Sequence, residues 1–483
     1  MKTAVHPSLL IVLACLLGAA CTKVGPDYAS QPPAVPSQWH QLSNTSASVQ
    51  YVEGAEDLSQ WWRVFADPPL SDLISEALQA SPDLRLAEAK LREARSRRQV
   101  TKAGLFPEVS ASGSGSRSYT GSEIGSGESR NLFSAGFDAS WELDVFGGLR
   151  RSVEAAEADL ETAAANLDNS RVSLVAEVAL NYIELRGLQL RLGIARRNLA
   201  SQSETLQLTE WRAEAGLVSS QDVEQARSNR EQTKAQIPSL GISLTEAEHR
   251  LDILLGKTPG SLHARLADES PLPNMPKDIA VAIPADVLRQ RPDIRAAERQ
   301  LAAETARLGV AEAARYPSFK LSGSIGLEAL SADALANRDA AVSSLLAGIT
   351  APIFDAGRLR SQVEIQDAVL AQTEITYQQA VLTALEDVEN ALLALSANSE
   401  RKEALTNAAD AARKAAQMAR QQYSAGLIDF QSLLDTERSV LTIEDSLAST
   451  SSENLLALIR LYKALGGGWS YHNQASQTRE DKS

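Results

Sequence analysis

The sequence is poor in the residues on which most metal, redox and disulfide sites depend. Its 483 residues include two cysteines, three methionines and five histidines, and only 5% of them are aromatic. Both cysteines, Cys15 and Cys21, lie in the first 21 residues, which excludes a disulfide framework or a cysteine-based zinc site in the rest of the chain. The histidines are scattered, without the i,i+3 or i,i+4 spacing of a metal-binding helix. We therefore expect no metal and no cofactor.

A stripe of positive charge is also missing. The chain carries 47 Lys and Arg against 61 Asp and Glu, a formal net charge of −14. Because a nucleic-acid-binding surface is usually basic, no nucleic acid partner is expected. There is no Walker-type glycine loop, no His-Glu-x-x-His pair and no nucleophile elbow. These absences argue against an enzyme, and the Gly/Ser-rich stretch 112–127 has the composition of a loop between strands.

The first twenty residues have the pattern of a secretory signal. Lys2 is followed by an unbroken apolar run of twelve residues, 9–20, which is too short to span a bilayer. Small residues at 18–20 precede Cys21, as at a bacterial lipoprotein cleavage site, although glycine stands where such sites usually have leucine. We predict that residues 1–20 are a lipoprotein signal peptide and that Cys21 is acylated. Cleavage at Cys15, or an ordinary signal peptide, is the alternative.

The mature chain offers no obvious transmembrane helix. After Cys21 it has no apolar run of 18 or more residues. Any crossing of a membrane would then use strands, because backbone groups in lipid need hydrogen-bond partners within the protein. Thr22 follows the cysteine, and an aspartate there commonly retains bacterial lipoproteins in the inner membrane. The sequence therefore favours delivery to the outer membrane.

The chain is internally duplicated at a constant offset of 210 residues. The matching landmarks are Ser81-Pro82-Asp83-Leu84 with Arg291-Pro292-Asp293-Ile294, Phe106-Pro107 with Tyr316-Pro317, Gly113-Ser114 with Gly323-Ser324, Ala215-Gly216-Leu217 with Ala425-Gly426-Leu427, and Leu255-Gly256 with Leu465-Gly466. A constant offset means that nothing has been inserted, on balance, between these landmarks. We infer two copies of one structural unit, at 66–256 and 284–466.

Three other segments flank the copies after the signal peptide. Residues 21–65 contain four prolines and are predicted to be a lipid-anchored N-terminal arm. Residues 257–283 are a proline-rich linker between the copies. Residues 467–483 form a polar C-terminal tail, which we expect to lack a fixed structure.

Each copy is predicted to begin with a helix, at 69–103 in the first, followed by two strands. In the stretch 131–143, Phe133, Phe137 and other apolar residues alternate with polar ones. Such a period of two marks a strand with one apolar face. The predicted strands lie at 106–118, 131–143, 317–327 and 342–354. Their lengths suit tilted transmembrane strands, which need about 9–11 residues.

Very long helices follow the strands. Residues 358–425 contain no glycine or proline, and their counterpart 150–215 contains no proline. At about 1.5 Å per residue, each helix would reach on the order of 100 Å and would need coiled-coil partners along its length. Gly216 and Gly426 are predicted to end these helices in the left-handed conformation. The returning helices are predicted at 220–256 and 430–465.

This α+β architecture predicts an oligomer. Four strands cannot close a membrane barrel, since the smallest have about eight strands, and open edges are not tolerated in lipid. Two copies of the chain would supply eight strands around a narrow, filled pore, whereas three would supply twelve and leave room for solutes. The helices would continue such a barrel as a hollow tube. The sequence therefore indicates a conduit.

Several stretches resemble the TolC-like outer-membrane efflux lipoproteins of the NodT subgroup. They are Cys21–Tyr28, Trp141–Gly147, Arg291–Arg295, Ala313–Pro317 and Leu461–Trp469. The resemblance covers about residues 21–469. It implies a homotrimer with a twelve-stranded transmembrane β-barrel in the outer membrane, on a long α-helical coiled-coil barrel in the periplasm. It also implies two protein partners, a periplasmic membrane-fusion adaptor and an inner-membrane pump of the RND class.

The resemblance further implies a gate at the periplasmic end. Asp435 and Arg438 are three residues apart on the returning helix of the second copy, so they share a helix face. In a trimer they would form rings of charge that could constrict a channel. The first copy has the uncharged Gln225 and Ser228 at the equivalent positions. A solvated i,i+3 salt bridge is the alternative.

The two helix turns are the expected docking sites for the adaptor, although simple tight turns without a partner are the alternative. The residues concerned are Gly216, Leu217, Val218 and Ser219 in the first copy, and Gly426, Leu427, Ile428 and Asp429 in the second. The expected function is a passive exit duct for small molecules. A channel for type I protein secretion and a soluble periplasmic coiled-coil adaptor remain alternatives. The cargo stays open, although the scarcity of methionine and histidine argues against metal export.

Overall fold

The computed structural model describes residues 23–30, 35–41, 49–51, 58–124, 127–276, 279–281 and 284–469. The predicted signal peptide, Cys21 and residues 470–483 of the tail lie outside these ranges. The chain divides into two compact units that cut across the sequence duplication. Unit one contains residues 1–32, 89–164 and 295–379, and unit two contains residues 33–88, 165–294 and 380–483. Each unit therefore takes one part of each copy.

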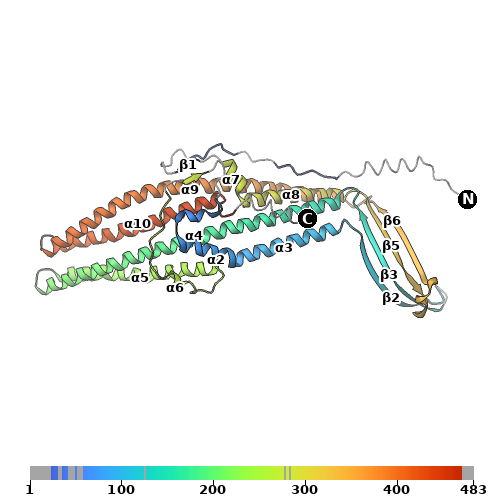
Figure 1. Cartoon of the computed structure of the whole chain (residues 1–483), viewed down its shortest axis with the longest axis horizontal. Coiled ribbons are helices and arrows are strands. Elements are labelled where there is room, and N and C mark those ends of the chain that lie inside the picture. Colours follow the sequence, from blue (N-terminus) through green and yellow to red (C-terminus); the bar gives the residue numbers. More distant parts are fainter. Residues whose placement is uncertain are drawn as a thin grey trace. The chain divides into compact units, whose positions relative to one another are not determined.

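Unit one contains the four long strands. They form an antiparallel sheet in the order β2-β3-β5-β6 (Figure 1), with bounds of Glu108–Tyr119, Ser129–Leu143, Ser318–Ala329 and Ala341–Thr350. Two short 3-10 helices, η3 (Asp333–Ala336) and η4 (Arg338–Ala340), connect β5 to β6. The four predicted strands are thus present. β2 and β6 are the edges of the sheet, and all their residues are exposed.

The predicted fourth strand, 342–354, extends too far. β6 ends at Thr350, which pairs with Ser318, the first residue of β5. Pro317 precedes that residue and has no N–H to donate, so β5 cannot extend the ladder further. Ile353 and Phe354 are 92% and 90% exposed. Within the chain, residues 351–354 therefore have no strand beside them.

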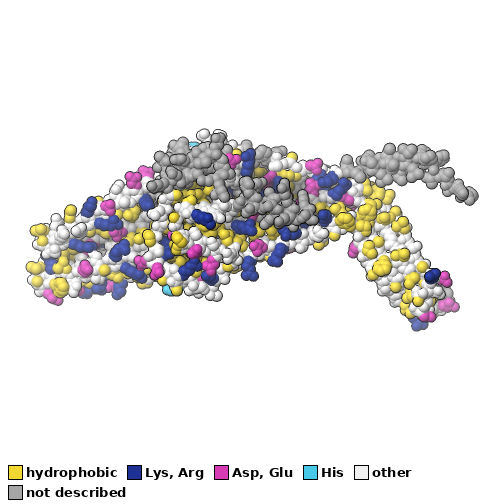
Figure 2. All heavy atoms as spheres, in the orientation of Figure 1, with side chains coloured by type: hydrophobic (Ala, Val, Ile, Leu, Met, Phe, Trp, Pro, Cys, Tyr) yellow, Lys and Arg dark blue, Asp and Glu magenta, His cyan; other side chains and the backbone are white. Residues whose placement is uncertain are grey.

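The strand register separates an apolar face from a polar one. Phe137 lies opposite Ala111 and Ile325, and all three belong to the apolar face. Phe137 and Ile325 are nevertheless 60% and 66% exposed. Figure 2 shows few charged side chains along the strands on the visible face, and a group of them around the loop end. A sheet that exposes large apolar side chains to this extent is not finished as a water-facing surface.

The polar face repeats one serine pair in both hairpins. The hydroxyls of Ser114 and Ser134 lie 2.8 Å apart, and those of Ser324 and Ser344, 210 residues later, are also 2.8 Å apart. The two β-hairpins therefore share one register, as the duplication predicts. Ser112 Oγ also donates to Asp138 Oδ2 at 2.7 Å on this face.

The long helices follow the predicted bounds closely. They are α4 (Gly148–Glu214), α5 (Ser220–Leu254), α9 (Arg358–Ser424) and α10 (Phe430–Ala464). α4 and α9 both run from unit one into unit two. Figure 1 shows that α4 with α5, and α9 with α10, form two hairpins joined by tight turns. No helix within the described ranges is both long and apolar enough to cross a membrane.

The predicted single helix at 69–103 is two helices. α2 (Pro68–Ala80) and α3 (Pro82–Ala103) are separated at Ser81, whose φ of −56° and ψ of 129° are not helical. The ring of Pro82 disfavours a helical conformation in the residue before it. The same break recurs 210 residues later, between α7 (Pro284–Gln290) and α8 (Pro292–Ala313).

The core of unit two lies along the middle of α4 and the second half of α10. Val178, Ile183, Leu458 and Leu461 are fully buried there. The rings of Trp61, in η2 (Leu58–Phe65), and Tyr462 stack at 5.2 Å. Smaller elements complete the unit, namely α6 (His263–Leu266) and the parallel strands β1 (Val49–Tyr51) and β4 (Ile279–Val281). The packing continues into the start of the tail, where Gly468 N donates to Leu58 O at 2.9 Å.

Candidate functional site

The two helix turns are built alike. Gly216 and Gly426 have φ of +71° and +76°, so each is the left-handed residue that ends its long helix, as predicted. Leu217 N donates back to Arg212 O at 2.8 Å, and Leu427 N donates to Gln422 O at the same distance. Together with the shorter bonds made by the glycine N–H groups, these contacts form Schellman motifs.

Each returning helix starts with a side-chain cap. Ser219 and Asp222 form a reciprocal capping box at the start of α5. Asp429 accepts a hydrogen bond from Ser432 N at 2.7 Å at the start of α10, and contacts with Ser432 lower the pKa of that carboxyl. Capping at both ends of a turn leaves little backbone freedom.

Each turn also presents one leucine to solvent. Leu217 is 68% exposed and Leu427 is 74% exposed, while the next residues, Val218 and Ile428, are partly buried. The rigid turns therefore hold an apolar side chain in water at equivalent points of both hairpins.

The second turn is anchored more firmly than the first. Tyr423 and Phe430 are buried side by side, with ring centroids 6.0 Å apart. Arg212, from the end of α4, lies 4.5 Å above the Tyr423 ring and donates to the Tyr423 carbonyl. The first copy has Ala213 and Ser220 at the two aromatic positions.

Asp435 and Arg438 do not pair with each other. Both are exposed residues of α10. Asp435 Oδ1 accepts from Gln431 Nε2 at 2.9 Å, and Arg438 Nε donates to Asn229 Oδ1 at 3.1 Å. The structure therefore does not contain the i,i+3 salt bridge considered as an alternative. Arg438 instead connects α10 to α5, the returning helix of the other copy.

Glu437 is a charged residue of this region that sequence reasoning missed. Its side chain is buried and accepts hydrogen bonds from Thr205 Oγ1 at 2.7 Å and Arg420 Nε at 3.2 Å. Burial raises the pKa of its carboxyl. The 210-residue offset could have found it, because Arg227 and Glu210 occupy the equivalent positions and form an ion pair at 3.4 Å. The same two helices of each hairpin are thus bridged in both copies, with the charges exchanged.

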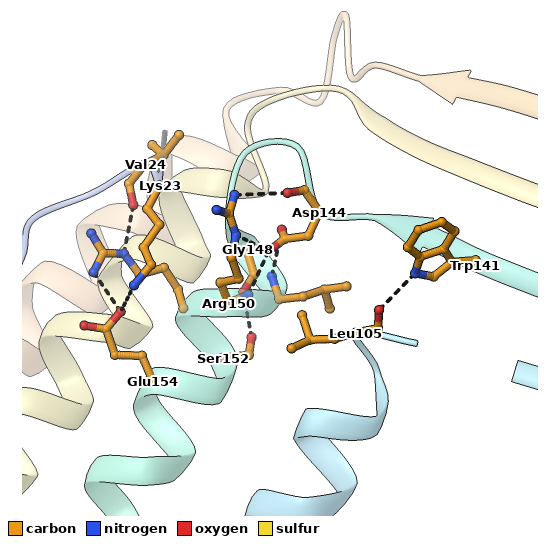
Figure 3. Close-up of polar contacts among 11 residues, drawn as sticks. Lys23, Val24, Leu105, Trp141, Asp144, Gly148, Arg150, Ser152 and Glu154 are labelled. Carbon is orange, nitrogen blue, oxygen red and sulfur yellow. Dashed lines mark hydrogen bonds and ion pairs between the residues drawn. The ribbon is translucent and has the colours of Figure 1, made fainter. Parts of the chain in front are cut away.

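The junction between β3 and α4 forms a second polar site (Figure 3). Asp144 caps α4 by accepting from Leu149 N at 3.1 Å and Arg150 N at 2.9 Å, and it also pairs with the Arg150 side chain. Trp141 Nε1 donates to Leu105 O at 3.0 Å. These contacts fix the foot of β3 on the start of the long helix.

No metal centre emerges among the residues that the structure describes. Groups of three or more His, Cys, Asp and Glu side chains placed to hold a metal ion do not occur within those ranges. The candidate sites are therefore the helix turns, the charged residues behind them and the strand–helix junction.

Comparison with known proteins connects these features to one family. A profile described as outer membrane efflux protein matches residues 73–257 and 283–467, so the second match begins and ends 210 residues after the first. The chain belongs to the outer membrane efflux protein family. The double match of this efflux family reproduces the duplication seen in the sequence, and the TolC-like fold is confirmed.

Individual members of the outer membrane efflux protein family are similar over almost the whole chain. Nodulation protein T of Rhizobium leguminosarum bv. trifolii is 32% identical, covering 94% of this chain and 96% of its own. The pyoverdine export outer membrane protein OpmQ of Pseudomonas aeruginosa is 32% identical, covering 97% and 98%. The solved outer-membrane channel OprN is 36% identical with a TM-score of 0.86, covering 92% of this chain and 99% of its own.

Family membership gives the exposed strands and the helical hairpins a common purpose. This efflux protein is an outer-membrane channel of a tripartite efflux pump, located in the outer membrane and extending into the periplasm. The expected class of function and location are confirmed. The roles of individual residues, and the lipid on Cys21, are developed below as proposals.

Proposed function

We propose that three copies of this chain close a twelve-stranded barrel, continued by a helical tube, and that the assembly is a passive, non-catalytic exit duct for small molecules. The observation that carries the proposal is the four-stranded sheet of unit one. It has one apolar and one polar face, and within the chain β2 and β6 each pair on one side only. Edges that carry unsatisfied backbone groups need partner strands in lipid.

The duplication supplies the register between copies. In β3–β5 pairing Ser140 lies opposite Ser322. Shifting the first residue forward and the second back by 210 places Thr350 of β6 opposite Ser112 of the next copy. The same shift places Ile353 opposite Val109 of the next copy, and both are exposed apolar residues in a single chain. This register explains why β6 stops at Thr350 here, since the partner strand for residues 351–353 belongs to another copy.

Cysteine cross-linking tests this register. The variant Ser112→Cys/Thr350→Cys carries the two substitutions on facing edges and should oxidise to a covalent trimer on non-reducing gels. The matched control Ser112→Cys/Ser344→Cys moves one cysteine six residues along β6, about 20 Å at the rise of a strand, and should not cross-link. A ladder that ends at the dimer, or equal cross-linking of the control, would exclude the proposed assembly.

The gate is proposed at Asp435 and Arg438. In a trimer three copies of each would face a common axis, and the link from Arg438 to Asn229 would hold α10 close to α5. The exposed positions of both residues support this role. Conductance measurements that separate charge from tethering are described in the Discussion.

The docking of a periplasmic adaptor is proposed at the two helix turns, with an inner-membrane RND pump as the further partner. The exposed leucines on capped turns support this role, because a rigid apolar residue suits a hydrophobic contact at low entropic cost. Leu217→Asp and Leu427→Asp should reduce efflux while the cross-linked trimer still forms. Full efflux by the double variant would place adaptor docking elsewhere.

Acylation of Cys21 is proposed from the small residues before it. Incorporation of labelled palmitate into the parent chain, but not into Cys21→Ser, is the expected result. Export of small molecules is preferred to protein secretion because a 32% identical relative is named for the export of pyoverdine. Cargo is addressed below by a susceptibility test.

A further inference from the structure

The described chain begins at the foot of the sheet. Val24 N donates to Phe146 O at 3.1 Å, and Phe146 lies between the end of β3 and the start of α4. Lys23 Nζ lies 3.3 Å from Glu154 Oε2 on the first turns of α4 (Figure 3). Residues 23–30, called the strap below, therefore start at the junction between strands and helices, all within unit one.

A buried arginine holds the strap. Arg151 is 1% exposed, and its guanidinium donates to Val24 O at 3.1 Å and Gly25 O at 3.0 Å. It also pairs with Asp27 at 2.8 Å and Glu154 at 2.9 Å. Three of these four acceptors belong to the strap. An arginine is almost never fully buried without such partners, so the site is complete only with the strap in place.

The second copy lacks this arginine. The residue 210 positions after Arg151 is Ser361. The first copy is preceded by an N-terminal arm that starts at the predicted acylation site, whereas the second is preceded by the linker. The holding residue thus occurs only in the copy that has a membrane anchor to hold.

The backbone is shaped to receive the strap. Gly25 has φ of +87°, and a Cβ added there would lie 2.5 Å from Gly309 Cα on α8. A Cβ on Gly147 would lie 2.9 Å from Lys23 Cα. Such distances are far below van der Waals contact, so the strap fits only because both positions are glycine.

Tyr28 anchors the other end of the strap. Its hydroxyl donates to Glu298 Oε1 at 3.1 Å, and Ser30 Oγ donates to the same oxygen at 2.6 Å. The Tyr28 ring packs on a cluster formed by Ala158, Ala302 and Ala303. Burial, together with the Glu298 charge, raises the pKa of Tyr28 to about 12, so the phenol keeps its proton at physiological pH.

We infer that Arg151 and Glu298 are positioning residues that hold residues 23–30 as a fixed strap, so that the acyl chains on Cys21 enter the membrane beside the foot of β3. The inference rests on the proposed acylation of Cys21. Two residues of chain reach at most about 7 Å, so a fixed Lys23 limits where the lipid can start. Aromatic residues gather at the same foot, where Phe146 stacks on Tyr316 at 4.8 Å, as is usual at a membrane boundary.

Spin-label mobility tests the strap. Ala29 is exposed, and a nitroxide on Ala29→Cys in the full-length, membrane-reconstituted protein should give a broad, immobile spectrum. Adding Arg151→Ala should convert it to a narrow, mobile one. Arg150→Ala is the matched control, because this neighbouring arginine contacts Asp144 and not the strap. An unchanged spectrum in Arg151→Ala, or equal loosening by Arg150→Ala, overturns the inference.

A second variant covers the case in which Arg151→Ala does not fold. Gly25→Val acts from the strap side, leaving every helix residue unchanged, and should also free the label. If the label stays immobile in Gly25→Val, the inference fails. Folding of each variant is checked by the Ser112→Cys/Thr350→Cys cross-link.

The position of the lipid is tested separately from its presence. Cells fed a photoreactive palmitate should yield parent protein whose acyl chain cross-links to its own peptides around Trp141, and Arg151→Ala should lose this product. Mass spectrometry of the N-terminal peptide reports whether Cys21 is acylated at all. An unmodified peptide refutes the acylation proposal while the label result still stands, and an unchanged cross-link in acylated Arg151→Ala refutes the strap.

Discussion

At the scale of single residues, Gly187 lies where α4 packs directly on α10. A Cβ at this position would lie 2.2 Å from Ser452 Oγ and 3.0 Å from Ser452 Cβ. Rotation of the serine side chain could move the hydroxyl but not its Cβ, so any larger residue must push the two helices apart. Gly193, two turns later on α4, has only ordinary contacts, the nearest being Arg197 Nη1 at 3.4 Å.

The two glycines should therefore respond in opposite directions to alanine. Gly187→Ala gains about 1 kcal/mol of helix propensity but overpacks the interface at a cost of about 1–3 kcal/mol, so the free energy of unfolding should fall. Gly193→Ala keeps the propensity gain and should raise it. Thermal unfolding in detergent measures both, and a shift in the same direction for the two variants would contradict the packing argument.

His263 should titrate at a higher pH than an ordinary histidine. Its Nδ1 lies 2.9 Å from the buried Glu248 carboxylate, which raises the pKa of the imidazole. Because the folded pKa is raised, the contact stabilises the fold fully below the unfolded pKa of about 6.5 and is lost as pH rises through the folded value. In NMR spectra of histidine-labelled protein, His263 should titrate later than in Glu248→Gln. Identical curves would mean that the contact is absent in solution.

At the scale of elements, the two helical hairpins are copies with different internal supports. The turns share Schellman motifs and capped returning helices, because glycine and cap residues recur at the same offset. The bridges behind the turns do not match. Glu437 is buried between α4 and α9, whereas its counterpart Arg227 lies exposed beside Glu210.

This difference predicts unequal costs for equivalent substitutions. Glu437→Ala leaves the hydroxyl of Thr205 and the guanidinium of Arg420 without their shared acceptor and should cost about 1–3 kcal/mol. Arg227→Ala breaks an exposed pair, which is worth about 0–1 kcal/mol. Denaturant unfolding of the two variants gives the comparison. Equal losses would show that Glu437 has no special structural role.

At the scale of the whole molecule, the compact units do not coincide with the sequence copies. Each unit combines segments of both copies, because α4 and α9 each run through both units. A functional change at one helix turn can therefore involve both copies, as the contact between Arg438 and Asn229 illustrates. The gate belongs to this scale, since charge rings need three copies.

Conductance in planar bilayers separates the two contributions to the gate. Asp435→Ala/Arg438→Ala removes both the charge and the link to α5 and should raise single-channel conductance. Asn229→Ala removes only the link, so an intermediate rise is expected if tethering contributes. Gln225→Ala, at the position equivalent to Asp435 in the first copy, is the control and should change nothing. Unchanged conductance in the double variant would remove the gate from this site.

The cargo can be identified only from the living cell. A duct need not bind what passes through it, so its lining carries little information about substrates. A strain lacking this chain should become more susceptible to a subset of small toxic molecules, and the parent gene should restore resistance. Restoration by the Leu217→Asp/Leu427→Asp variant would show that export does not need the proposed docking leucines. A strain with no change in susceptibility but a defect in protein release would favour the secretion alternative.

The sequence by itself determined the duplication, the four strands and the long helices, because these follow from local periodicity and from the placement of glycine and proline. Its two errors were also local in origin. The helix break at Ser81 needed the effect of Pro82 to outweigh a long helical pattern, and the end of β6 depends on a partner strand that one chain does not contain.

Only the tertiary structure decided which side chains meet. Arg151 reaches carbonyl groups of the strap 127 and 126 residues away, and Thr205 reaches Glu437 across 232 residues. No periodic pattern encodes such contacts, since each depends on how separate helices pack and on which polar groups they leave buried. The sequence thus established what kind of channel subunit this is, while packing established where its N-terminal anchor is held and how its second hairpin is braced.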